Sequence, residues 1–235
     1  MFGIITGFVC LFCFCIVQVK ALTKTLDRQH ADKLIMKLHK PASGLLLLGC
    51  IVQIILIFPV IKMRHPVILL TGFTTVGCYL LLIVFCHNRG LRLLPGNHAG
   101  KRNAAYKLSL HRIMSVIMLL LVIVHIVFYY IDFALYEQRI ASVRLHGIEC
   151  TLLKDGTYIG EYDAGYIYAQ VSVTVTSGIV TDIRLLEHRH QRGQAAEQIV
   201  SDIITSQNTN IDAVSGATNS SLVIKKAVEN ALSIN

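Results

Sequence analysis

The stretch Asp212-Ala213-Val214-Ser215-Gly216-Ala217-Thr218 stands directly before a segment with the period of an amphipathic helix, 219–233. The first turn of a helix carries backbone N–H groups without intrahelical partners at the positive end of the helix dipole, so a phosphoryl group on Thr218 would be stabilised there. Gly216 and Ala217 leave room for backbone to approach a phosphate, and Ser215 supplies a hydroxyl donor. The simpler interpretation is that Ser215 or Thr218 merely caps the helix.

The residues before this stretch predict a small domain of strands followed by helices. Lys154-Asp155-Gly156-Thr157-Tyr158 leads into Gly160, and 168–175 alternates in the manner of a half-buried strand. Thr176-Ser177-Gly178 predicts a turn, after which 179–186 returns as the second strand of a hairpin. A helix is predicted over 193–207, ahead of the final helix. This order of elements is typical of an α+β domain.

Together these features resemble the FMN-binding domain family, which includes the C subunit of the sodium-pumping NADH:quinone oxidoreductase and the G subunit of the Rnf complex. In that family the threonine of an S-G-A-T run carries FMN through a phosphoester bond. The resemblance therefore implies covalent FMN on Thr218, attached by a flavin transferase. It implies cofactor contacts from the rest of the quoted stretch: Asp212, Ser215, Gly216 and Ala217.

A second part of the resemblance lies between the hairpin and the following helix. Glu187-His188 and Arg192-Gly193 resemble a loop that lies near the flavin ring in family members. The resemblance thus implies that Glu187, His188 and Gly193 contribute to the cofactor site. The alternative is that His188 and His190 belong to a solvated turn.

The first 140 residues predict a membrane domain. Four apolar stretches, 2–19, 43–61, 66–86 and 114–133, are each close to the roughly 20 residues that a helix needs to cross a bilayer. The first stretch lacks the basic start and the small-residue cleavage site of a signal peptide, so we interpret it as a retained helix. The predicted fold is a membrane all-α four-helix bundle, 1–140, followed by a small α+β extracytoplasmic domain, 141–235.

Charge placement predicts the orientation of these helices. The segments 20–40 and 87–112 each carry six lysines and arginines. By the positive-inside rule both segments are cytoplasmic, which places both termini and the whole C-terminal domain outside the cytoplasmic membrane. The formal net charge of +8 therefore reflects topology and contact with anionic lipid. From residue 145 onward we count six basic and ten acidic residues, so the sequence predicts no nucleic-acid partner.

The fourth predicted helix carries two histidines, and an ionisable side chain in a transmembrane helix predicts a functional role because it is costly there. His111 and His125 are fourteen residues apart, about 21 Å along a helix and within about 40° of one face. The run His111-Arg112-x12-His125 resembles helices of ferric-reductase-like and other b-type membrane cytochromes, in which such pairs bind two stacked haems. The resemblance implies haem b between neighbouring helices.

The second predicted helix, with the residues that lead into it, has a related but incomplete pattern. His39-Lys40-Pro41-Ala42-Ser43-Gly44 resembles the entry of a haem-binding helix, with the glycine allowing close approach of the macrocycle. Fourteen residues after His39 the sequence has Gln53 instead of histidine. The preferred axial pair of a cytoplasmic-side haem is therefore His39 and His111, with His87 as an alternative to His39. For an outer haem His125 pairs with His65, or has a weak or absent second ligand.

The combined prediction is a transmembrane flavocytochrome b. Electrons would pass from a cytoplasmic reductase or menaquinol through haem to FMN on the outer face, and from there to an extracytoplasmic acceptor. No glycine fingerprint for NAD(P)H is present, so another protein would supply the primary reductase. Three alternatives remain open: a quinone site built around the same histidines, a haem-free membrane anchor for a flavin carrier, and a flavin redox sensor.

Overall fold

The computed structural model describes the backbone of residues 2–23, 29–87, 99–148 and 153–233. Side chains are described for 5–18, 37–85, 106–148 and 153–233. The chain divides into two compact units, one of Met1–Ile61 with Pro66–Phe128 and one of Lys62–His65 with Tyr129–Asn235. Each unit is described by itself below.

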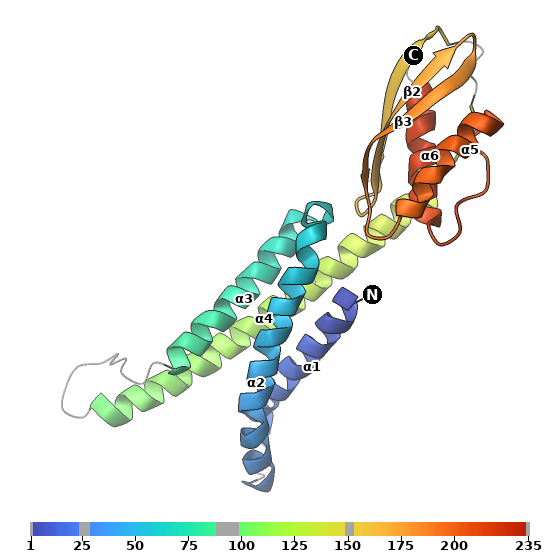
Figure 1. The fold of residues 1–235 in the computed structure, drawn as a ribbon. Helices are drawn as coiled ribbons and strands as arrows, with labels where there is room; N and C mark the ends of the chain where they lie inside the picture. Colours follow the sequence, from blue (N-terminus) through green and yellow to red (C-terminus); the bar gives the residue numbers. More distant parts are fainter. Residues whose placement is uncertain (1, 24–28, 88–98, 149–152, 234–235) are drawn as a thin grey trace. The chain divides into compact units, whose positions relative to one another are not determined.

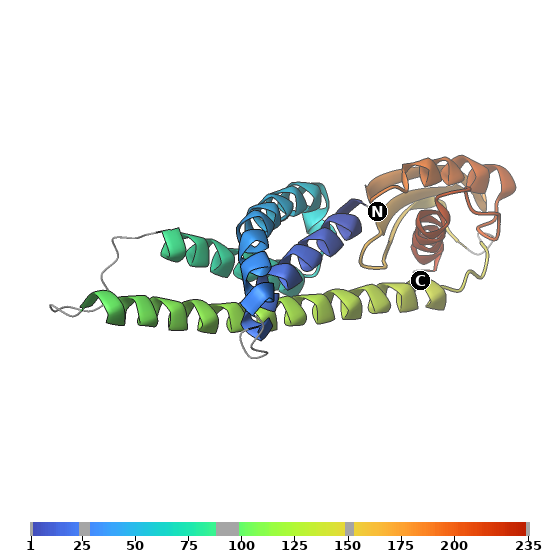
Figure 2. The same ribbon diagram turned by 90° about the horizontal axis from the view of Figure 1, so that it is seen from below.

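The N-terminal unit is built from helices, one in each predicted apolar stretch (Figure 1). They are α1 (Phe2–Thr23), α2 (Gln29–Ile57), α3 (Pro66–His87) and α4 (Ala99–Ser142), with a short 3-10 helix η2 (Phe58–Met63) after α2. Figure 2 shows α4, the longest, as one continuous helix that extends into the C-terminal unit. A helix therefore lies in each of the four predicted apolar stretches, whereas the prediction of a four-helix transmembrane bundle stays a prediction.

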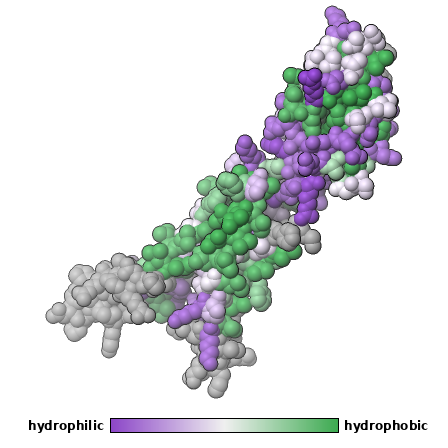
Figure 3. Space-filling model, viewed as in Figure 1, coloured by the Kyte–Doolittle hydropathy of each residue, from purple (hydrophilic) through white to green (hydrophobic). Residues whose placement is uncertain are grey.

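Three helical segments of the described residues are long and apolar enough to cross a membrane: Lys37–Met63, Pro66–Phe85 and Tyr106–Ser142. The described apolar part of α1, Ile5–Gln18, is shorter. Large hydrophobic side chains such as Phe12 and Leu70 are exposed on these helices. Figure 3 shows a mostly hydrophobic surface on the visible face of the helical unit, whereas the C-terminal unit shows more hydrophilic surface. Such surfaces are compatible with a membrane protein, since lipid solvates them.

One feature of α2 differs from the expectation. The segment from His39 to Gly44 lies inside the helix instead of at its entry, because α2 begins at Gln29 and continues through Pro41. A proline within a helix removes one backbone hydrogen bond, which the rest of a long helix can tolerate at a cost. Gln53, at the position where the two-haem pattern has a second histidine, accepts a hydrogen bond from the Thr6 hydroxyl of α1.

The C-terminal unit contains a three-stranded antiparallel sheet in the order β1-β2-β3. Its strands are β1 (Gly156–Asp163), β2 (Tyr168–Thr176) and β3 (Ile179–Arg189). Ser177 and Gly178 join β2 to β3 with φ of 54° and 74°, as a two-residue hairpin turn requires. The predicted hairpin is confirmed, β1 is an additional strand, and β3 is longer than expected because its pairing with β2 continues to Arg189.

Helices cover one face of this sheet. They are η3 (Gln194–Gln198), α5 (Ile199–Ser206) and α6 (Thr218–Leu232). α6 packs on β1 and β2, and α5 packs on β3 (Figures 1 and 2). The core contains alternate residues of β2 and the apolar sides of both helices, among them Val171, Val173, Val175, Ile199, Ile203, Val223, Ile224 and Val228. The observed order of strands and helices confirms the α+β prediction for this domain.

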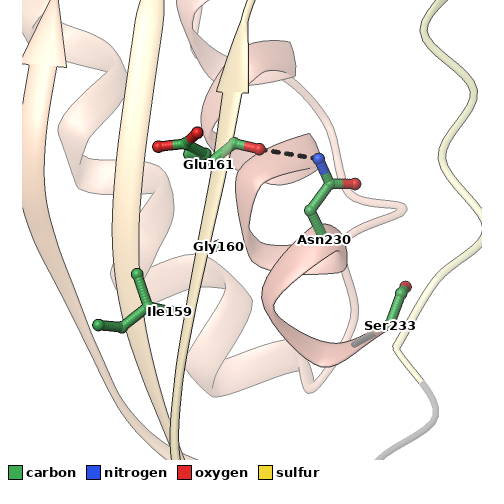
Figure 4. Close-up of a pocket in the computed structure, with 5 residues that line it drawn as sticks. All are labelled: Ile159, Gly160, Glu161, Asn230 and Ser233. Atoms are coloured by element: carbon green, nitrogen blue, oxygen red, sulfur yellow. Dashed lines mark hydrogen bonds between the residues drawn. The ribbon is translucent and has the colours of Figure 1, made fainter. Parts of the chain in front are cut away.

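Gly160 sets how closely α6 approaches the sheet. A Cβ atom at this position would overlap the backbone of Ala227 and Ala231, so β1 and α6 are in direct backbone contact there. Beside it, Asn230 Nδ2 donates a hydrogen bond of 2.8 Å to the Glu161 carbonyl oxygen (Figure 4). This bond satisfies a carbonyl on the edge strand of the sheet.

Replacing Gly160 by alanine is therefore expected to destabilise the domain by about 1–3 kcal/mol or more, since backbone on both sides must move. Gly156→Ala is the matched control on the same strand, because its Cβ would meet nothing closer than Tyr158 Cε2 at 3.9 Å. Denaturant unfolding of the purified chain, followed by tyrosine fluorescence, measures both. Equal stability of the two variants would contradict the close packing of α6 on β1.

Glu229 joins α6 to the segment that follows α4. Its buried carboxylate accepts hydrogen bonds from the backbone N–H groups of His146 and Gly147 at 2.8 and 2.9 Å, from Thr209 Oγ1 at 2.7 Å and from Lys226 Nζ at 3.2 Å. Burial alone would raise the pKa of this carboxyl group, but the four hydrogen bonds lower it below the usual value. The resulting stabilisation is present above the ordinary carboxyl pKa and is lost as the pH falls through the lowered one.

Candidate functional site

The predicted attachment loop forms a tight turn into α6. The backbone N–H of Ala217 donates to the Val214 carbonyl at 3.0 Å, and Gly216 has a φ of +76°. Only glycine adopts this backbone conformation without strain, and the space where its Cβ would lie is open. The turn therefore presents bare backbone next to Thr218.

Ser221 holds this turn in place. Its hydroxyl accepts the N–H of Val214 at 3.1 Å and donates to the carbonyl of Ala217 at 3.1 Å, and its side chain is fully buried. The sequence analysis did not select Ser221. A hydroxyl residue on the buried side of an amphipathic helix, three positions after the motif threonine, is the signal that could have indicated it.

Thr218 is the first residue of α6, and its side chain is exposed. The N-cap residue is Ala217, which makes no side-chain capping bond, so the alternative in which Ser215 or Thr218 caps the helix is not what the structure shows. The Thr218 hydroxyl lies instead at an open helix N-terminus, where backbone N–H groups favour an anion. Ser215, also exposed, lies in the same turn.

Lys225 on the buried side of α6 stabilises the start of the attachment loop. Its ammonium group donates to the Ile211 carbonyl at 2.7 Å, and the side chain is buried. Burial lowers the pKa of Lys225, while the negative charges of Asp212 and Glu229 oppose that shift. Asp212, the predicted cofactor contact, is exposed on the loop.

Gly193 lies against the first turn of α6. A Cβ at this position would come within 2.6 Å of Ser220 Cβ, so no other residue fits without displacing the helix. Its backbone N–H donates to His190 Nδ1 at 2.9 Å. The structure therefore brings Gly193 and His190 to the same end of α6 as the attachment loop.

Glu187 and His188 lie in β3, not in a turn. The His188 side chain is only 3% exposed, and its Nδ1 lies 3.0 Å from Glu197 Oε1. The alternative of a solvated turn is therefore wrong for His188, because the strand continues and η3 covers the ring. Glu187 is exposed and pairs with Arg189 at 3.2 Å. Burial, followed by the nearby His188, lowers the pKa of His190, with Glu197 opposing the shift.

An aromatic contact beside Thr218 was also missed by the sequence analysis. Asn219 Nδ2 donates to the Tyr136 hydroxyl at 2.9 Å, and the Tyr136 ring lies 5.0 Å from that of Tyr166. Tyr136 belongs to the last part of α4, far from the motif in sequence. Nothing in the local pattern around Tyr136 indicates this contact.

In the helical unit, His39 on α2 and His111 on α4 are neighbours. Their ring centroids are 6.3 Å apart, with the planes inclined by 63°. If one nitrogen of each ring bound the same metal ion at about 2 Å from opposite sides, the ring centres would lie roughly 6 Å apart, so these two residues could hold such a group. Gly44 of α2 has open space at its Cβ position.

His125 is held against α3. Its Nδ1 lies 3.0 Å from Thr71 Oγ1, and a Cβ on Gly72 would lie 3.1 Å from the ring. A hydrogen bond between the Thr71 hydroxyl and Nδ1 would orient the His125 imidazole and leave Nε2 free to bind a metal. His65, at the turn between η2 and α3, is exposed. The side chain of His87 lies outside the described residues.

Comparison with curated proteins and with solved structures finds no significant match to the chain. Residues 165–233, however, match the family model of the FMN-binding domain. The matched range contains β2, β3, the attachment loop and α6 up to its end. This match supports FMN binding by the C-terminal part of the chain and indicates a flavin-based role in electron transfer.

Proposed function

We propose that the protein is a transmembrane flavocytochrome b that passes electrons to FMN bound covalently at Thr218 on the outer face of the cytoplasmic membrane. The observation that carries the proposal is the exposed Thr218 hydroxyl at the N-terminus of α6, inside the range that matches the FMN-binding domain. FMN supplies one- and two-electron chemistry, and haem b supplies one-electron transfer.

The chain's own residues suit a phosphoester at Thr218. The α6 N-terminus offers backbone N–H groups to phosphate oxygens, and Gly216 leaves the approach open. Ser221 and Lys225 hold the loop from its buried side. Because these supports do not involve the Thr218 hydroxyl, a flavin transferase can modify that oxygen without disturbing the fold.

The proposed inner haem ligands are His39 and His111. Support comes from the 6.3 Å spacing of their rings and from the open space at Gly44. His125, oriented by Thr71, is the proposed ligand of an outer haem. His65 and His87 stay alternatives for the remaining positions.

The proposed orientation in the membrane, and with it the direction of electron transfer, follows from the placement of basic residues. The twelve basic residues of 20–40 and 87–112 favour a cytoplasmic location for both segments and an outer location for the FMN-binding domain, in a multi-pass protein of the cell membrane. The proposed donor is a cytoplasmic reductase or menaquinol, and the proposed acceptor is extracytoplasmic. Covalent attachment keeps an exported cofactor from loss by dilution.

The orientation is tested with reporter fusions. A reporter after Asn235 should be active outside the cytoplasm, and one inserted at Gly96 should be active inside, because basic segments stay on the cytoplasmic side. Activity of an alkaline phosphatase or a fluorescent protein distinguishes the two sides. The opposite pattern would place the flavin in the cytoplasm and remove outward electron transfer from the proposal.

A further inference from the structure

Two histidines at the end of β3 face the same side of the sheet. His188 and His190 are two residues apart in extended chain, which points their side chains in one direction. Their ring centroids are 4.3 Å apart. Arg189 between them points the other way, with its guanidinium 4.1 Å from the Tyr168 ring centroid. No cation of the described residues pairs with the two histidines.

Glu197 of η3 meets both rings. Its Oε1 lies 3.0 Å from His188 Nδ1 and 4.0 Å from His190 Nε2. One ligand atom from each of the three residues lies within 4.8 Å of the other two. The side chains of His188 and His190 are 3% and 20% exposed, so protein covers two sides of the group, while Glu197 at 43% leaves an entry from solvent.

We propose that His188, His190 and Glu197 bind one divalent transition-metal ion of the Zn²⁺ type. Two imidazole nitrogens and one carboxylate oxygen form a ligand set that such ions prefer over Mg²⁺ or Ca²⁺, and water completes the coordination. The proposal stands on this geometry and does not rest on the proposed electron-transfer function. Among the described residues, this is the one group of three or more such side chains with this spacing.

The observed separations between the three ligand atoms need to change only slightly to match a tetrahedral metal site. Bonds of about 2.0–2.1 Å in a tetrahedral site place ligand atoms roughly 3.3 Å apart, between the observed 3.0 and 4.0 Å separations. A neutral His188 ring that binds the metal through Nδ1 carries its proton on Nε2, so the metal takes the place of the direct contact between Nδ1 and Glu197. Nε2 of His188 is buried and has no hydrogen-bond partner among the described residues, so that ring is held by the protein at Nδ1 only.

Binding through His190 Nε2 has one structural consequence. A ring that gives Nε2 to a metal carries its proton on Nδ1, which then can no longer accept the Gly193 N–H. The Gly193 turn must adjust, and Gly193 packs directly on Ser220 in the first turn of α6. Metal binding is therefore linked to the end of α6 that carries Thr218.

The test uses the full chain, purified in detergent without a histidine tag and dialysed against micromolar ZnCl₂. Elemental analysis should find about one Zn²⁺ per chain, and Co²⁺ in its place should give the visible absorption of a low-symmetry N/O site. Glu197→Gln and His190→Ala should each lower the bound metal at least tenfold. His146→Ala, which removes an exposed histidine outside the group, is the matched control and should keep it.

Glu197→Gln is expected to fold normally, because it changes a partly exposed side chain by one atom. Loss of metal in this variant therefore reports the loss of a ligand and not misfolding. The Thr218→Ala chain, tested in parallel, should bind Zn²⁺ normally whether or not Thr218 carries flavin in the native protein. Absence of bound metal in the native chain would overturn the proposal. So would equal binding in Glu197→Gln, His190→Ala and the control.

Discussion

Replacement of Thr218 by alanine is expected to abolish covalent flavin attachment completely. Only the hydroxyl oxygen can form the phosphoester, and this side chain makes no hydrogen bond that holds the loop, a task performed by Ser221 and Lys225. The fold should therefore be retained, with a stability change within about 0.5 kcal/mol, as for an exposed surface position. In-gel flavin fluorescence after co-expression with a flavin transferase measures the attachment.

Thr205→Ala is the matched control for this experiment. Thr205 is an exposed threonine of α5, outside the attachment loop, and its removal should leave the fluorescent band unchanged. A fluorescent Thr218→Ala band of normal intensity would refute the attachment site. Loss of the band together with loss of folded protein would instead show that Thr218 has a structural role that its exposed position does not indicate.

If the proposed inner haem is present, replacement of His111 or His39 by leucine is expected to remove it, with loss of its Soret absorbance. The bilayer should tolerate leucine, since an apolar side chain inserts more readily than imidazole. Reduction of FMN by a cytoplasmic-side reductant, measured in inverted vesicles, should stop. His125→Leu should change only an outer haem or an outer quinone site, because its ring lies against Thr71 and Gly72.

His146→Leu is the control for the histidine series, since His146 is exposed in the segment after α4. Its spectrum and flavin reduction should match those of the native chain. If His39→Leu, His111→Leu and His125→Leu all keep normal spectra and normal flavin reduction, the histidines are structural. The bundle would then be a membrane anchor for a flavin carrier, and the transmembrane electron path would be wrong.

Local patterns in the sequence were sufficient for the main elements. The alternation of 168–175 and the Ser177-Gly178 turn predicted the β2–β3 hairpin, because side-chain direction in a strand has a period of two and the turn needs positive φ. The four apolar stretches predicted four helices for the same local reason. The S-G-A-T run indicated the site, and the match of 165–233 to the FMN-binding domain supports the flavin.

Other features depend on residues that are far apart in sequence. β1 has glycines at 156 and 160 that weaken its strand pattern, and it forms because β2 supplies its hydrogen bonds and α6 packs on Gly160. The burial of His188 depends on η3, and the Tyr136–Asn219 contact joins positions 83 residues apart. No period or motif encodes such contacts.

By itself, then, the sequence determined the membrane-compatible helices, the α+β order and the candidate attachment threonine, since these follow from hydrophobic periodicity and short motifs. The tertiary structure alone decided that Ala217, not Ser215 or Thr218, is the N-cap residue of α6, and that Ser221 holds the loop. It also decided that His188, His190 and Glu197 meet as one group. The physical reason is that hydrogen bonds and metal-ligand geometry require atoms within a few ångströms, and only packing of distant segments brings them there.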